Sequence, residues 1–477
     1  MMKQKVDDLN FLRFLTVSLP PGIEDPCLSS VLSPLTQEEL HGYFSIYNSQ
    51  KSLFLKQMHL YVYIPFCATI CSYCHCERMP LKEASQLSRY VDFVIKQINE
   101  FGESFDKTDF ESCSVLGGTA SLLSGLQIRM IFEAVLKKFR FKKEARFNFE
   151  GHPGSLSVDK LKVLQGYGIH TIHLGVQSLD ASVLKRINRP QTRAEVGRTI
   201  KLIKKMGFPC INVDLVAGLP GQTTQSFLSD IKDLVGWGTD LFNINPFSDV
   251  SVVPCFKNIE VTLAQMLDAR HEMIHQAKMM LEGYGYGNKG QRGYFKEARD
   301  ESCKLDAKVY PGGVLGLGLL AKSNLPGTLV FKTLLDADKM TGRYIGFAID
   351  KRYSMAQYAW LHMLYGLDTK AFRKIFGQDF LSVFSQEIRF LLDKGVISKK
   401  KEVYSYAGQR TIKRLFNYFA YTQILLGEKM IGKFKQVLRF KYDPCREYGS
   451  NADLVKVFQN FEFTREYYQV GKKTLWL

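Results

Sequence analysis

A region of about 200 residues alternates between short apolar runs and amphipathic segments, and this alternation constrains the fold more than any other feature. The run Ile211–Val216 has the length and β-branched content of a buried strand, whereas Ile128–Phe139 carries apolar residues at helical spacing. Glycine or proline punctuates most of the joints. Six strands are predicted in this way, with helices between them: 60–64, 114–116, 146–149, 171–174, 211–216 and 241–244.

Strands that alternate with helices predict parallel βαβ units with right-handed crossovers. Such units build either a Rossmann-like open sheet or a partial barrel. The flanking segments are less regular. We therefore predict three parts: an N-terminal arm (1–54), an α/β core (55–330) and a basic, mainly helical C-terminal module of helical or winged-helix type (331–477).

The composition fits a globular chain, with 45% hydrophobic and 23% charged residues in 477. No run approaches the ~20 apolar residues that a membrane-spanning helix needs. The apolar segment Phe11–Leu19 contains Arg13 and ends in two prolines, so a cleavable signal peptide is not predicted. We expect a cytoplasmic protein without a transmembrane segment.

The positive charge is concentrated at the C-terminal end. Residues 351–477 contain 23 basic and 11 acidic residues, a net charge of +12, which leaves +5 of the total +17 for the first 350 residues. Such an excess attracts anions, among them nucleic acid, an anionic membrane surface or a polycarboxylate substrate. A solvated basic surface without any partner explains it equally well.

Four of the ten cysteines, Cys67, Cys71, Cys74 and Cys76, fall within ten residues of one another. In a reducing compartment such a group indicates metal or redox chemistry. The first three form a C-x3-C-x2-C pattern just after the first predicted strand, a spacing at which thiolates hold iron–sulfur clusters. Three thiolates leave one iron of a four-iron cluster open. The alternative is a structural zinc site with Cys76 or His75 as fourth ligand.

Polar or glycine residues follow all six predicted strands, at the end where ligands bind in parallel α/β folds. Turn chemistry explains any one of these loops, but it explains the cysteine group, Glu150 and Asp214 together poorly. Besides the cysteine loop, these residues are Gly117–Ser121, Glu150, Gly175–Ser178, Asp214 with Gly218–Gly221, and Asn245–Pro246.

On these residues the sequence resembles the radical SAM superfamily, in the HemN-like branch. That branch includes oxygen-independent coproporphyrinogen III dehydrogenase, the haem chaperone HemW and the class C radical SAM methyltransferases. The similarity covers roughly residues 55–325. It rests on Tyr61–Cys74, the Gly-Gly-Thr-Ala-Ser of 117–121, Gly168–Leu179, Ile187–Arg189, Asn212–Gln222 and Leu315–Gly318.

The resemblance implies a partial (β/α)6 TIM-like barrel that carries a [4Fe-4S] cluster on Cys67, Cys71 and Cys74. It also implies reductive cleavage of S-adenosylmethionine (SAM) to a 5′-deoxyadenosyl radical, with one or two SAM per chain and a one-electron donor such as flavodoxin or ferredoxin. For the first SAM, it implies contacts from Tyr61, Tyr73, Gly118, Thr119 and Glu150.

Gln177, Arg189 and Asp214 would contact the second SAM. From the residue types alone, an acidic group at a strand end suits ribose hydroxyls or an ammonium, and Arg189 suits a carboxylate. The alternative for Arg189 is an exposed arginine at a helix end.

The substrate predicted by the resemblance is an anionic tetrapyrrole that undergoes oxidative decarboxylation of its propionates. Cys76 favours it, since a Cys-x-Cys ending resembles the coproporphyrinogen dehydrogenases, and so does the basic excess. Ala120, where the family has proline, and the absence of a Tyr-Thr-Ser-Tyr-Pro stretch point away from that substrate. The alternatives are a class C methyltransferase acting on a planar or lipophilic acceptor, and a HemW-like haem chaperone. A nucleic-acid-modifying enzyme is a weaker alternative, and peripheral contact with a membrane stays open.

Overall fold

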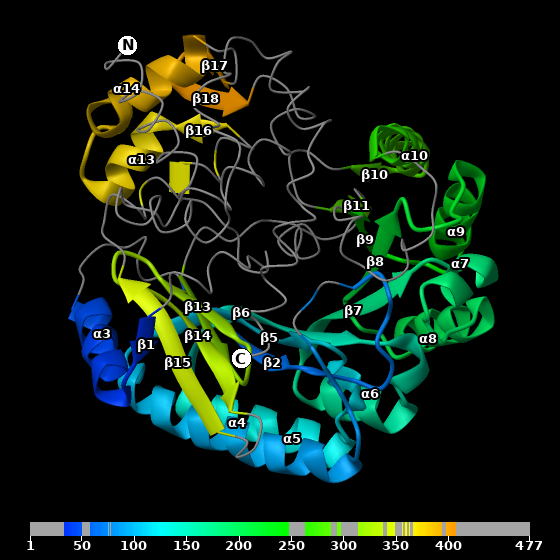
Figure 1. Ribbon diagram of the computed structural model, residues 1–477, viewed down its shortest axis with the longest axis horizontal. Helices are drawn as coiled ribbons and strands as arrows, with labels where there is room; N and C mark the ends of the chain where they lie inside the picture. Colours follow the sequence, from blue (N-terminus) through cyan, green and yellow to red (C-terminus); the bar gives the residue numbers. More distant parts are fainter. Residues whose placement is uncertain are drawn as a thin grey trace, which may run out of the picture.

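One large sheet forms the centre of the molecule (Figure 1). The structure is a computed structural model. It describes residues 33–49, 58–74, 76, 78–247, 263–287, 293–296, 313–336, 341–348, 355, 358–359, 362, 366–393 and 397–406.

Six strands that follow one another in the chain lie side by side and run parallel, in the order β2-β5-β6-β7-β8-β9. They confirm the six predicted strands, and each is longer than its predicted run, most of all β5, β6 and β7. A further parallel strand, β12 (Gly313–Leu317), pairs with β2 on the side of β2 that faces away from β5. The bounds of the six are β2 (Met58–Ile64), β5 (Asp109–Gly117), β6 (Arg140–Gly151), β7 (Ile169–Gln177), β8 (Cys210–Ala217) and β9 (Leu241–Pro246).

Helices that connect these strands lie along the outer side of the curved sheet (Figure 1). Several of these helices are preceded by an N-cap residue, whose side chain accepts one of the backbone N–H groups left without a partner in the first turn. Ser124 caps α5, Thr192 caps α8 and Thr223 caps α9, each within a capping box. The bounds are α4 (Ala84–Ser104), α5 (Gly125–Lys138), α6 (Val158–Gly166), α7 (Ala181–Arg186), α8 (Arg193–Lys205), α9 (Thr224–Gly236) and α10 (Leu263–Gly283).

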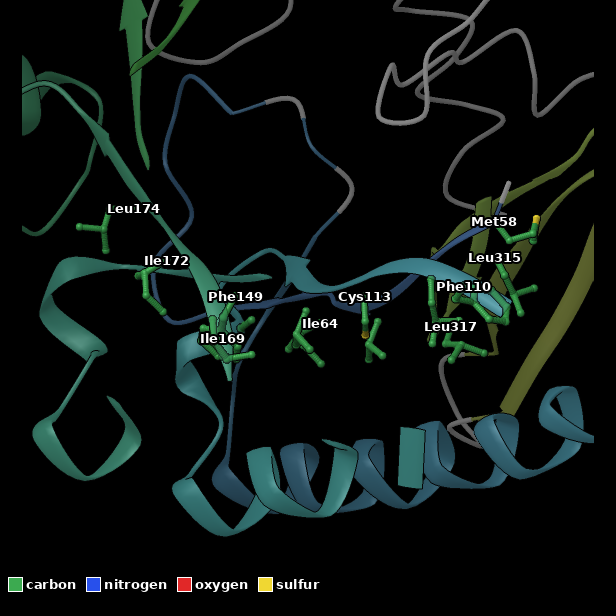
Figure 2. Close-up of a cluster of buried hydrophobic side chains, with 14 of the residues drawn as sticks. Met58, Ile64, Phe110, Cys113, Phe149, Ile169, Ile172, Leu174, Leu315 and Leu317 are labelled. Atoms are coloured by element: carbon green, nitrogen blue, oxygen red, sulfur yellow. The ribbon is translucent and has the colours of Figure 1, made fainter. Parts of the chain in front are cut away.

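The main core lies between the strands and these helices. In β2 the apolar residues Leu60, Val62 and Ile64 are buried, while Tyr61 and Tyr63 between them are only partly buried. Because side chains alternate along a strand, the tyrosines face the inner side of the sheet. Figure 2 shows Ile64 and the buried side chains of neighbouring strands above the helices. The outer face therefore stabilises the fold, and the inner face is available for chemistry.

The sheet continues beyond the predicted core on both edges. Antiparallel strands β13 (Lys322–Leu325), β14 (Leu329–Asp336) and β15 (Thr341–Ala348) extend it past β12, and β1 (Ser33–Leu35) pairs with β15. Beyond β9 follow β11 (Tyr294–Lys296) and β10 (Tyr286–Gly287). With β1 and β10 at its two edges, the sheet is the expected partial barrel, extended by hairpins.

One predicted boundary cuts through a strand, and the predicted N-terminal arm contains regular structure. The boundary after residue 330 falls inside β14, and the arm 1–54 contributes β1 and the helix α3 (Gln37–Ser49), whose Phe44 packs against Phe101 of α4. Lysine and threonine interrupt the apolar pattern of β14, so periodicity alone did not reveal it. Residues 1–32 of the arm lie outside the described residues.

The described part of the C-terminal module contains two helices and a small antiparallel sheet in the order β16-β18-β17. No helix among the described residues is long and apolar enough to cross a membrane. The elements are α13 (Thr369–Phe376), α14 (Phe380–Asp393), β16 (Leu367–Asp368), β17 (Ile397–Lys400) and β18 (Val403–Tyr406).

Candidate active site

The cysteine loop follows β2 and is closed by a short two-stranded ladder. β3 (Phe66–Cys67) pairs with β4 (Met79–Pro80), and the Leu81 N–H donates to the Cys67 carbonyl at 2.9 Å. Within the loop, the Cys74 N–H donates to the Cys71 carbonyl at 3.2 Å. Cys67 and Cys71 are buried and Cys74 is partly buried. The chain thus folds the three predicted ligands into one compact loop.

The thiols in this loop interact with one another. A hydrogen bond with the Cys76 side chain, assisted by the charge of Arg78, lowers the pKa of Cys74 to about 6. Burial raises the pKa of Cys67, and the Cys74 and Cys71 thiols nearby add to the rise. Cys76 is exposed and lies against Cys74. The loop therefore favours a thiolate at Cys74.

Two glycines at the end of β5 let its backbone approach the cysteine loop. Gly118 donates its N–H to the Ile64 carbonyl at 2.8 Å, and a Cβ on Gly118 would lie 2.8 Å from Cys67 Sγ. Gly117 has a φ of +133°, and a Cβ there would lie 2.5 Å from the Ile64 carbonyl oxygen. Only glycine fits at these two positions without displacing neighbouring backbone. Thr119 follows, and its side chain hydrogen-bonds Cys67.

Two carboxyl groups from different strands meet at the same end of the sheet. Glu150 of β6 accepts the Gly117 N–H at 3.2 Å. Burial raises the pKa of Glu150 to about 7, and the carboxylate of Asp214 adds to this rise. Asp214 lies on β8 beside Gly175 of β7. The strand order thus brings together the two predicted acidic residues, although they are far apart in the sequence.

Gln177 and Arg189 lie beside these carboxyl groups. Gln177 ends β7 with a φ of 70°, a left-handed conformation that is unusual for a residue other than glycine. A Cβ on Gly175 would lie 3.1 Å from Gln177 Nε2 and 3.3 Å from Arg189 Nη2. The guanidinium of Arg189 donates to the Gly175 carbonyl and, at 3.0 Å, to Gln191 Oε1. Arg189 is thus directed into the site, and the interpretation as an exposed arginine is wrong.

The two predicted tyrosines have different surroundings. The hydroxyl of Tyr61 donates to the Lys322 carbonyl of β13 at 2.7 Å, so Tyr61 ties β2 to the added hairpin. Tyr73 packs against a small apolar cluster that includes Leu184 and Ile187, and burial raises the pKa of its hydroxyl. Tyr73 thus belongs to the cysteine loop but rests against the segment around α7.

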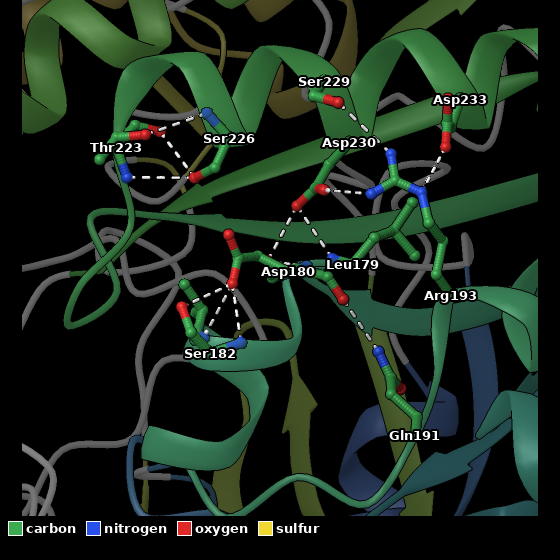
Figure 3. A network of polar contacts seen from close by, with 12 residues as sticks. Leu179, Asp180, Ser182, Gln191, Arg193, Thr223, Ser226, Ser229, Asp230 and Asp233 are labelled. Atoms are coloured by element: carbon green, nitrogen blue, oxygen red, sulfur yellow. Dashed lines mark hydrogen bonds and ion pairs between the residues drawn. The ribbon is translucent and has the colours of Figure 1, made fainter.

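A buried polar network fixes the loop that follows β7 (Figure 3). Asp230 is 1% exposed and accepts from Ser178 Oγ at 2.8 Å and from the Leu179 N–H at 2.9 Å. Gln191 Nε2 donates to the Ser178 carbonyl at 3.0 Å. Burial raises the pKa of Asp230 to about 6. The network holds the residues directly after Gln177.

Three residues at the site were not singled out from the sequence. Arg78 donates from Nη1 to the Cys76 carbonyl at 2.6 Å, Asn188 reaches the cysteine loop, and Gln191 supports Arg189. Asn188 lies inside the Ile187–Arg189 motif, so the motif could have indicated that Asn188 belongs to the site. Nothing in the spacing of Arg78 or Gln191 distinguishes them from surface residues.

The donor set fits an iron–sulfur cluster. Among the described residues, no group of three or more His, Cys, Asp or Glu side chains is placed to enclose a metal ion. Cys67, Cys71 and Cys74 share one loop, and the thiols of Cys71 and Cys74 lie close enough to Cys67 to affect its pKa. A cluster suits this arrangement because its thiolates bind separate irons. Gly117 and Gly118 bring the backbone after β5 directly against this loop.

A comparison with protein families decides the assignment. Residues 61–234 match the model of the radical SAM superfamily. This part of the chain is a radical SAM domain. The cofactors expected from the sequence, a [4Fe-4S] cluster and SAM, are those of this superfamily and are confirmed with it. Which residues hold them stays a prediction.

Curated relatives of this radical SAM domain have two different names. The haem chaperone HemW of Lactococcus lactis subsp. lactis is 33% identical over 172 residues, which are 36% of this chain and 44% of the relative. The oxygen-independent coproporphyrinogen III oxidase of Escherichia coli is 25% identical over 198 residues, which are 42% of this chain and 43% of the relative. The matches span less than half the length of either relative. They confirm the resemblance to the HemN-like branch.

A solved structure confirms the fold over a longer stretch. Coproporphyrinogen III oxidase (HemN) from Escherichia coli, described as a radical SAM enzyme, superimposes with a TM-score of 0.69 at 18% identity. The superposition covers 82% of this chain and 95% of that chain. At this identity the similarity establishes the α/β architecture alone.

Proposed function

We propose that this chain is a radical SAM enzyme that oxidatively decarboxylates propionate side chains of a tetrapyrrole, as a coproporphyrinogen III dehydrogenase does. The observation that supports the reaction type is the three-cysteine loop packed against Gly118 inside a radical SAM domain. The substrate class rests on the relatives named coproporphyrinogen III oxidase and on the Cys74–Cys76 pair.

In this proposal the chain's own residues bind and orient the cofactors. Cys67, Cys71 and Cys74 hold the cluster, and Gly118 with Thr119 leaves room for the methionine end of SAM. Glu150 accepts from the same SAM, and Tyr61 and Tyr73 contact it beside the loop. When bound, the cluster and SAM would supply a 5′-deoxyadenosyl radical to take a hydrogen atom from a propionate. Loss of CO2 and transfer of one further electron to a one-electron acceptor would then leave a vinyl group.

Gln177, Arg189 and Asp214 are proposed to contact a second SAM. Gln177 ends β7 and Asp214 lies on β8. Arg189 follows α7 and donates to the Gly175 carbonyl of β7. Asp214 suits ribose hydroxyls or an ammonium, since both donate hydrogen bonds to a carboxylate. The electron for SAM cleavage is proposed to come from a flavodoxin or a ferredoxin.

A haem chaperone is the second candidate, and the 33% identity to a HemW favours it. In that case the domain keeps its cluster and binds haem without consuming much SAM. Both candidates share the cysteine loop, so the geometry of that loop does not discriminate between them.

Product analysis discriminates between the candidates. The anaerobically reconstituted chain is incubated with SAM, dithionite and coproporphyrinogen III. The proposal expects 5′-deoxyadenosine and CO2 in step with loss of propionates, and no turnover by the Cys71→Ala variant. S-adenosylhomocysteine would identify a methyltransferase. Tight haem binding with little SAM consumption would identify a chaperone, and either result would overturn the proposed decarboxylation.

A further inference from the structure

The guanidinium of Arg189 contacts the sulfur of Cys71. Nη1 lies 3.5 Å from Sγ, although the two residues are 118 positions apart in the sequence. The other two nitrogens of the group are also engaged, by the Gly175 carbonyl and by Gln191 Oε1. A planar guanidinium held at three nitrogens cannot swing away from the thiol. The contact with Cys71 is therefore part of a fixed arrangement.

The segment that carries Arg189 also holds the cysteine loop through its backbone. The Ser72 N–H donates to the Ile187 carbonyl at 2.9 Å, and Asn188 Nδ2 donates to the Ile70 carbonyl at 3.0 Å. Asn188 has a φ of 52°, a left-handed conformation that asparagine tolerates better than most residues. The residues on both sides of Cys71 are thus tied to one segment, which we call the strap (Arg186–Arg189).

A hydrogen bond and a positive charge at a cluster thiolate change the energetics of reduction. Reduction adds one negative charge to the cluster, and hydrogen bonds to the sulfurs and the net charge nearby set the reduction potential. Arginine remains protonated at any ordinary pH, so its charge is permanent. The reduced state gains more from this charge than the oxidised state does.

We propose that Arg189 is a positioning residue for the cluster: it directs Cys71 Sγ toward the iron and raises the cluster's reduction potential. This inference rests on the proposed function, since it requires the cluster on Cys67, Cys71 and Cys74. It is separate from contact with a second SAM. Three of the five guanidinium N–H groups are used by the chain, and the effect on the potential exists without any SAM.

The test compares reconstituted Arg189→Gln and Arg189→Lys with wild type and with a matched control, Arg186→Gln. Arg186 is an exposed residue of the same strap, and its side chain lies beside Gly221. Iron and sulfide contents are measured, and the midpoint potential is obtained by a redox titration followed by EPR in the absence of SAM.

Arg189→Gln removes the charge and the hydrogen bond, so the ratio of reduced to oxidised cluster at a given potential is expected to fall roughly tenfold, or about 59 mV for one electron. Arg189→Lys keeps the charge without the three-way contact and should show a smaller shift. Arg186→Gln should match wild type.

If Arg189→Gln loses iron while Arg186→Gln keeps its full iron content, the positioning role is supported. The effect on the midpoint potential is then measured in Arg189→Lys. Full iron and an unchanged potential in Arg189→Gln would overturn the inference. A wild-type chain that assembles no four-iron cluster would instead overturn the proposed function, so the two failures are distinguishable.

Discussion

The two sides of the candidate site are built by different means. Beside the cysteine loop, backbone makes the surface: Gly117 and Gly118 bring β5 so close that an added Cβ would meet Ile64 backbone or Cys67 Sγ. At the ends of β7 and β8, the surface of the site is made of side chains. Other side chains, such as Asp230 and Gln191, hold this region in place. At these two glycines there is no room for an added Cβ. A surface made of side chains accepts small additions and is sensitive to the loss of single groups.

The largest expected effect is the loss of the cluster when a cysteine of the loop is replaced. Replacing Cys67, Cys71 or Cys74 by alanine should abolish cluster assembly, because in the proposed site three thiolates hold the cluster and none is redundant. Cys76→Ala should keep the cluster. Iron and sulfide analysis with EPR checks both statements. If Cys76→Ala loses its iron and wild type binds no SAM, a closed four-ligand site replaces the open one.

On the side-chain side, Asp214→Ala is expected to reduce product formation strongly while part of the reductive SAM cleavage survives. A carboxylate hydrogen bond is worth roughly 1.5–3 kcal/mol, or about 10–150-fold in affinity. Product and 5′-deoxyadenosine are quantified in the same assay, with equilibrium binding of SAM alongside. A stably folded variant that binds two SAM per chain with unchanged affinity would contradict the second SAM site. Loss of thermal stability together with all activities would show a structural carboxylate.

Glu150 links the two sides and should make the stability of the cofactor-free chain depend on pH. Its pKa is about 7 in the fold and 4.5 ordinarily. Between these values the folded chain holds a proton that the unfolded chain has released. The free energy of unfolding therefore falls as pH rises from 4.5 to 7, by up to ~3 kcal/mol.

Glu150→Gln should flatten that dependence in urea titrations at pH 5 and pH 7.5. Because Asp214 contributes to the raised pKa, Asp214→Asn should shrink the dependence without removing it. Equal pH dependence in wild type and Glu150→Gln would show that this carboxyl does not titrate in a buried position.

A pair of glycine substitutions tests the comparison directly. Gly118→Ala places a Cβ 2.8 Å from the Phe66 carbonyl oxygen and from Cys67 Sγ, and should destabilise the chain by ~1–3 kcal/mol and impair cluster assembly. Gly175→Ala meets only the ends of two side chains, at 3.1 and 3.3 Å, and should cost less. Thermal unfolding and iron content are measured for both. The comparison is wrong if Gly175→Ala is the more damaging substitution.

Local sequence patterns were sufficient to predict the parallel strands of the fold and to single out the cysteine loop. The apolar runs and their punctuation predicted β2 and β5 to β9, because periodicity is a property of neighbouring residues. The antiparallel hairpin of β13, β14 and β15 was missed, since lysine, serine and threonine break its apolar alternation. Its pairing with the core depends on residues far away in the chain.

For the candidate site, the sequence by itself determined which groups are present: the C-x3-C-x2-C spacing, the glycines after β5 and the acidic residues at two strand ends. Only the tertiary structure decided which of them meet. Sheet order brings Asp214 close enough to Glu150 to raise its pKa, and the strap brings Arg189 to the sulfur of Cys71 across 118 residues. The physical reason is that spacing along a chain records local periodicity, whereas proximity between strands depends on their order and register.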